Sequence, residues 1–321
     1  MSEDAYVIQE LRSPGRIKSL TVDQSSSFLS AIDTLQAAAE YALNYRILLQ
    51  SHIDFEKLLL TMTVDYAYLE PHLTSSNFAP DARVRINLAI LTILTAFRAY
   101  ADQTERQFRQ IDGSGSLWNQ YRETSGTIYD GSFSYRVVDQ LRNHVQHVAV
   151  PMSSFSLPSD NEWVDGVPGG NRPSRLHMTI SPRLRISNML SDPKIKKRVK
   201  EELDDLGKDY IDLKGLLRTF AAALSQIYSA IYPSILTQVE NAESAYNEVL
   251  DLLPLRDGKR VFAVQLLQGE RVCRSLISGF PKEVTSLLAQ PNLGYTYRSY
   301  ISSRVRVDSN SSPGTKDTVW I

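Results

Sequence analysis

Three long segments carry apolar residues at the spacing of an α-helix, and this pattern limits the possible folds more than any other feature of the chain. The first runs from Ser25 to about Glu70, where Pro71 stops it. The second covers about 81–111 and the third 212–253. The pattern leaves open whether the first segment is one helix or two with a bend. Because apolar stripes bury against one another, the sequence predicts a mainly α fold built as a helical bundle.

The middle of the second segment, Ile86–Phe97, is apolar on nearly all sides, so we expect it at the centre of the bundle. It contains Asn87, Thr92 and Thr95 and is too short to span a bilayer, so no membrane contact is predicted. The start, Met1–Ala5, is acidic and lacks the basic and apolar regions of a signal peptide. We therefore expect a cytoplasmic protein.

Composition narrows the functional classes. The chain has 35 Lys and Arg against 36 Asp and Glu, a net charge of −1. A protein that coats long nucleic acids is usually basic, so any contact with nucleic acid must be local. The single cysteine, Cys273, can form no intramolecular disulfide and no Cys/His zinc spacing. We therefore expect neither a metal site nor a cofactor.

The pattern divides the chain into three regions. Residues 1–24 form an irregular N-terminal segment in which Tyr6–Ile8 and Ile17 suit short strands. Residues 25–253 form the helical bundle, interrupted at about 151–192 by an insertion of loop and strand that is rich in Ser, Pro and Gly. Residues 254–321 form a mixed C-terminal segment with alternating tyrosines and valines and a flexible tail.

Shorter elements are expected between the long helices. A helix over about 117–123 should end before a break at Gly126, and a charged helix should cover about 193–206. Partial alternation over 175–186 suits a strand or a short hairpin around Pro182. A helix over about 133–147 can be capped by Ser132 or Ser134. Its apolar face is formed by Val138, Leu141, Val145 and Val148.

The end of that helix carries the most informative motif, Leu141-Arg142-Asn143-His144-Val145-Gln146-His147. It resembles the Arg-Asn-x-x-x-His signature of the HEPN superfamily (higher eukaryotes and prokaryotes nucleotide-binding), and the resemblance covers about residues 25–150, with 212–253 as a returning helix. It implies a helical bundle whose motif helix follows two long helices. It also implies a metal-independent endoribonuclease of toxin or antiphage systems, with RNA as substrate, a homodimer, and an antitoxin or defence partner.

These residue types suit RNA cleavage without metal, which uses the 2′-OH as an internal nucleophile. His147 would transfer the proton, Arg142 would hold the phosphate, and Asn143 would orient either group; His144 is a possible auxiliary. Asn143 and His147 share a face, whereas Arg142 and His147 lie about 140° apart around a regular helix. They would converge if His147 lies in a frayed last turn, or if two copies of the helix meet across a two-fold axis.

A second interpretation needs no catalysis. Arg142 would be the ion-pair partner of Asp139, three residues earlier, and His147 would be favoured by the dipole at a helix C-terminus. The chain would then be a non-catalytic helical protein that binds a protein partner or a nucleotide. Packing of Arg142 against Asp139 and the core favours this interpretation, whereas convergence of Arg142 and His147 in an accessible cleft favours catalysis. A metal site at His144 and His147 is discounted because Asp139 is the only acidic residue in this segment.

Overall fold

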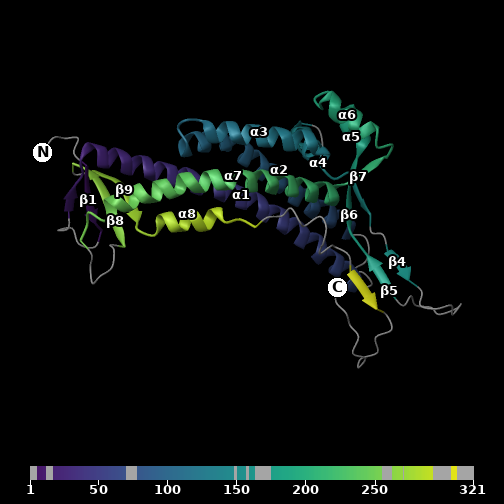
Figure 1. The fold of residues 1–321 in the computed structure, drawn as a ribbon. Coiled ribbons are helices and arrows are strands. Elements are labelled where there is room, and N and C mark those ends of the chain that lie inside the picture. Colours follow the sequence, from purple (N-terminus) through teal and green to yellow (C-terminus); the bar gives the residue numbers. More distant parts are fainter. Residues whose placement is uncertain are drawn as a thin grey trace. The chain divides into compact units, whose positions relative to one another are not determined.

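A computed structural model describes residues 6–11, 17–69, 78–147, 150–156, 159–162, 175–254, 262–269, 271–291 and 305–308. As predicted, this described part is mainly helical, with eight helices and ten short strands (Figure 1). The helices are α1 (Val22–Leu69), α2 (Phe78–Ile111), α3 (Ser116–Gly131), α4 (Phe133–His147), α5 (Ile186–Ser191), α6 (Lys197–Asp204), α7 (Leu213–Leu250) and α8 (Phe280–Leu288).

The first long segment is one continuous helix, which answers the question that the sequence left open. Helix α1 begins at Val22, before the expected start at Ser25, because Thr21 and Gln24 form a capping box. The Thr21 hydroxyl accepts from the Gln24 backbone N–H at 3.2 Å, and the Gln24 side-chain oxygen accepts from the Thr21 N–H at 3.0 Å. Pro71 lies outside the described residues.

The chain divides into two compact units, each built from several segments. Unit 1 contains residues 1–46, 99–126 and 227–291. Its antiparallel sheet has the order β2-β1-β8-β9, from β1 (Tyr6–Glu10), β2 (Ile17–Ser19), β8 (Ala263–Gln268) and β9 (Arg271–Ile277) (Figure 1). The predicted N-terminal strands are confirmed, and β1 pairs with β8 in the register Ile8 to Leu266.

The core of unit 1 is aromatic. Tyr41 and Tyr45 of α1 stack on Tyr228 of α7 with centroid separations of 5.6 and 4.0 Å. The Tyr41 and Tyr100 hydroxyls are 3.0 Å apart, and burial raises the pKa of both phenols well above the usual value. Each hydroxyl therefore has a hydrogen-bond partner where water cannot reach it.

Unit 2 contains residues 47–98, 127–226 and 292–321, and it includes the motif helix α4. It has two three-stranded antiparallel sheets. One has the order β3-β6-β7, from β3 (Ser154–Ser156), β6 (Ser181–Arg185) and β7 (Tyr210–Asp212). The other has the order β10-β5-β4, from β10 (Val305–Asp308), β5 (Arg175–Met178) and β4 (Ser159–Glu162).

The structure differs from the local expectations at three places. Helix α3 passes through Gly126, because an isolated glycine only weakens a helix and does not end it. Over 175–186 the strand alternative is confirmed by β5 and β6, whereas the hairpin around Pro182 does not form, since the two strands pair in different sheets. Helix α2 is not buried on all sides: Ile90 is fully buried while Leu88 is 63% exposed. The apolar residues of Ile86–Phe97 therefore lie on both the buried and the exposed face of α2.

By length and composition, α2 is the one described helix that could cross a membrane. In the most apolar stretch of α2, 39% is buried within the protein. The core helix of a globular protein passes the same test, so this finding alone does not assign α2 to a bilayer.

Candidate functional site

The motif helix forms as predicted, with bounds Phe133–His147. The Ser132 hydroxyl accepts from the Tyr135 backbone N–H at 3.2 Å, and the Ser132 carbonyl accepts from the Arg136 N–H. Ser132 is therefore the N-cap. Val137, Val138 and Leu141 are fully buried and fix the helix on the core.

A second face of α4 carries polar residues that are buried as well. Arg136, Gln140 and His144 follow one another at a spacing of four residues, and all are at most 6% exposed. Arg136 donates to both Glu202 oxygens, at 3.0 and 2.8 Å, and the Gln140 side-chain oxygen accepts from the Lys196 backbone N–H at 3.1 Å. This stripe joins α4 to the segment that contains α5 and α6.

His144 completes the stripe. Its Nδ1 lies 2.7 Å from Oδ2 of Asp192, and the two side chains are 1% and 2% exposed. The hydrogen bond from His144, helped by the Lys194 backbone N–H, lowers the pKa of the Asp192 carboxyl below its ordinary value. The possible auxiliary of the motif is thus enclosed and already paired, which suits a positioning role.

Arg142 lies on a different face and makes three contacts. Its Nη2 is 3.5 Å from the Asp139 carboxylate, so the predicted i, i+3 ion pair is confirmed. Its Nε and Nη2 donate to the Asn143 side-chain oxygen at 3.3 and 3.1 Å. The guanidinium carbon lies 5.6 Å from the ring centroid of buried Phe97, and the side chain is 12% exposed.

His147 is the last residue of α4, so the helix geometry that separates it from Arg142 ends there. Its side chain lies outside the described residues. The prediction that Arg142 and His147 converge therefore stays a prediction. The structure brings Arg142 and Asn143 together and pairs His144 with Asp192.

Two other arginines of unit 2 are each paired with a carboxylate through two hydrogen bonds, and Arg142 can be compared with them. Arg136 makes a bidentate pair with Glu202, and Arg218 of α7 makes one with Glu56 of α1. Within the described residues, by contrast, Arg142 donates no hydrogen bond to a carboxylate; its contact with Asp139 is at ion-pair distance only. Asn143 and Phe97 orient the Arg142 guanidinium, and no carboxylate in the described part of the chain accepts a hydrogen bond from it.

Sequence reasoning missed Asp192 and the polar stripe on α4. The spacing of Arg136, Gln140 and His144 was a usable signal, because polar residues four apart share a helix face. The partners came from residues 192–202, and nothing in the sequence linked that segment to α4. Among the described residues, no group of three or more His, Cys, Asp or Glu side chains could hold a metal ion.

Comparison with known proteins adds no family. No family model matches the chain, and no curated protein or solved structure is similar to it.

Proposed function

We propose that this chain is a HEPN-like, metal-independent endoribonuclease with Arg142, Asn143 and His147 as its catalytic residues. The observation that carries the proposal is the hydrogen bonding of the Arg142 guanidinium, although its packing against Asp139 and Phe97 is what the non-catalytic interpretation expects. Asn143 and Phe97 hold this guanidinium in place, yet no described carboxylate is hydrogen-bonded to it. The contact with Asp139, at 3.5 Å, is an ion pair without a hydrogen bond, so a phosphate could take its place beside the guanidinium.

The proposed chemistry needs only the chain, the RNA and a proton from solvent. His147 takes the proton of the 2′-OH, and the 2′ oxygen attacks the adjacent phosphorus. The bond from phosphorus to the 5′ oxygen breaks, and that oxygen takes a proton from solvent. Arg142 binds the non-bridging oxygens and offsets the charge that grows on them. His144 and Asp192 keep α4 in position and do not touch the RNA.

A second candidate is a non-catalytic helical protein that binds a protein partner or a nucleotide. It is favoured by the low exposure of Arg142, 12%, and by its packing against Asp139 and Phe97. In that case Arg142 stabilises α4 and needs no substrate.

Cleavage assays separate the two candidates. Purified full-length protein should cleave RNA, leave DNA of the same sequence intact because DNA lacks the 2′-OH, and remain active in EDTA. Arg142→Ala and His147→Ala should each abolish cleavage with nearly unchanged melting temperatures. Arg46→Ala, which removes an exposed arginine of α1, is the matched control and should keep full activity.

Two results would contradict catalysis at this motif. Full activity in His147→Ala would exclude His147 as the proton carrier. Inactive wild-type protein together with a large loss of stability in Arg142→Ala would favour the non-catalytic candidate. We further propose a cytoplasmic role in toxin or antiphage defence, with an antitoxin or defence partner. Expression of the wild type should then arrest bacterial growth, and Arg142→Ala should relieve the arrest.

A further inference from the structure

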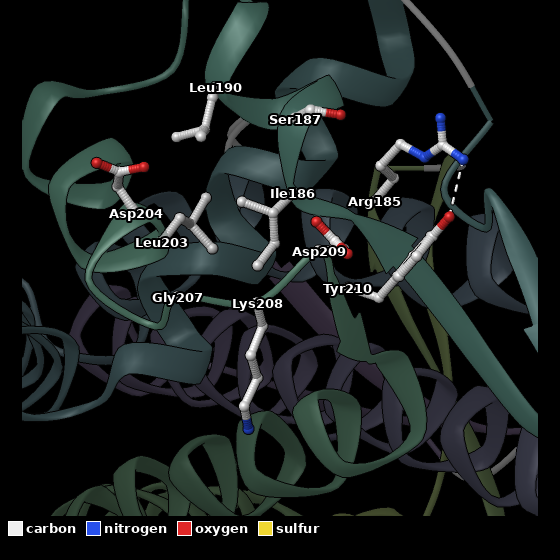
Figure 2. A pocket seen from close by; sticks show the side chains of 10 residues that line it. All are labelled: Arg185, Ile186, Ser187, Leu190, Leu203, Asp204, Gly207, Lys208, Asp209 and Tyr210. Atoms are coloured by element: carbon white, nitrogen blue, oxygen red, sulfur yellow. Dashed lines mark hydrogen bonds between the residues drawn. The ribbon is translucent and has the colours of Figure 1, made fainter.

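The segment from β6 to β7 lines an open surface cavity of about 530 Å³, which lies in the range of roughly 300–1,000 Å³ that small-molecule sites occupy. It is lined by Arg185, Ile186, Ser187, Leu190, Leu203, Asp204, Gly207, Lys208, Asp209 and Tyr210 (Figure 2). Neither Arg142 nor Asn143 lines it, so what binds here goes beyond the proposed function.

Backbone contacts fix the walls of this cavity. Strands β6 and β7 pair Arg185 with Tyr210, and the Ile186 N–H donates to the Asp209 carbonyl at 2.9 Å. Gly207 adopts φ of +59°, a conformation that most side chains avoid, and so allows the turn that leads to Asp209. The backbone on both sides of the cavity is therefore fixed by hydrogen bonds within the chain.

Its floor is apolar and its two ends are acidic. Ile186 and Leu203 are at most 3% exposed, and in Figure 2 they lie between the carboxylates of Asp204 and Asp209. Within the described chain, neither carboxylate has a side-chain hydrogen bond or an ion-pair partner. A ligand that spans the floor would thus meet a negative charge at each end.

A cation stands beside one of these ends. Arg185 donates from Nη2 to the Tyr210 hydroxyl at 2.8 Å, and its guanidinium carbon lies 5.4 Å from the Tyr210 ring centroid. In Figure 2 the Arg185 guanidinium is turned toward the Tyr210 hydroxyl and lies nearer to Asp209 than to Asp204; its other donors are available to a ligand anion. Lys208 points away from the other lining residues in this view.

We propose that this cavity binds a free basic α-amino acid, such as lysine or arginine. The α-ammonium group meets Asp209 and the α-carboxylate meets Arg185. The methylene stem lies on Ile186 and Leu203, and the side-chain cation meets Asp204. Each charge of the ligand then has a partner of opposite sign. A nucleotide fits less well, because its phosphate charge would face two carboxylates.

Isothermal titration calorimetry on the full-length protein tests this assignment with three probes. L-Lysine should bind at least about tenfold more tightly than L-norleucine, which has a similar stem without the terminal charge. Cadaverine, which keeps both amines and lacks the carboxylate, should also bind at least about tenfold more weakly than lysine.

Variants locate the binding. Asp204→Asn should reduce the affinity for lysine to the affinity for norleucine. Asp209→Asn should weaken the binding of both lysine and norleucine. Asp205→Asn is the matched control: Asp205 is exposed, adjacent to Asp204 and outside the lining, so lysine binding should stay unchanged. Circular dichroism melting curves confirm that each variant is folded.

Three results would overturn the proposal. The first is no binding heat from lysine at millimolar concentration. The second is equal affinity for lysine and norleucine in the wild type. The third is tighter binding of AMP than of lysine, which would make the cavity a nucleotide site. None of these depends on ribonuclease activity, so failure here is distinct from failure of the proposed function.

Discussion

At the residue scale, the clearest consequence of burial concerns His52 of α1. Its side chain is buried, and Nδ1 has no hydrogen-bond partner among the described residues. Burial lowers its pKa below the ordinary value of 6.5; nearby Glu56 raises the pKa and Arg218 lowers it. The folded state therefore keeps His52 neutral at pH values where the unfolded chain is protonated.

The sign of the pH effect follows from this difference. As pH falls through 6.5 toward the folded pKa, the unfolded state binds more protons and the free energy of unfolding decreases. We expect His52→Gln to lose less stability than the wild type between about pH 7.5 and pH 5. Urea unfolding at a series of pH values measures this. An unchanged pH slope in His52→Gln would contradict the neutral, buried histidine.

At the element scale, α3 shows how a helix tolerates a weak residue. Gly126 lies on an exposed position inside the helix, and a Cβ built there meets no atom within 4 Å. Glycine inside a helix costs roughly 0.5–1 kcal/mol relative to alanine, because its unfolded state has more conformations to lose. Gly126→Ala should therefore raise the free energy of unfolding by about that amount, as measured by chemical denaturation.

The control for this prediction is Gly115, just before the same helix. Its φ is +78°, a conformation that alanine adopts only with strain, so Gly115→Ala should destabilise the protein. If both substitutions stabilised the chain, or if Gly126→Ala destabilised it, the helix through Gly126 would be in doubt.

At the scale of the whole molecule, the proposed active site is incomplete in one chain if α4 stays regular to its end. Arg142 and His147 then point about 140° apart, so two copies of α4 near a two-fold axis would have to share the site. We therefore expect a homodimer. Two Arg142 side chains repel each other without a ligand, so a short RNA should tighten the dimer by linkage.

Sedimentation velocity with and without RNA measures the association. In a mixture of Arg142→Ala and His147→Ala proteins, one of the two sites can draw both intact residues from different chains, so partial activity should return. A strict monomer at micromolar concentration in both conditions would rule out the shared site.

Local signals in the sequence determined the three long helices and the motif helix α4, but not the end of α3 or the short helices α5 and α8. The apolar stripe of α4 and the hydroxyl of Ser132 act within a few residues of the chain, so its bounds could be predicted. The ion pair of Arg142 with Asp139 was predictable for the same reason, because residues three apart on a helix are neighbours.

Only the tertiary structure decided which distant residues meet. β1 pairs with β8 across more than 250 positions of sequence, and His144 meets Asp192 after an insertion of loop and strand. The cavity between Asp204 and Asp209 likewise exists only because Arg185 and Tyr210 pair in one sheet. Periodicity identifies which face of an element is buried, but the partner of that face depends on how all elements pack together.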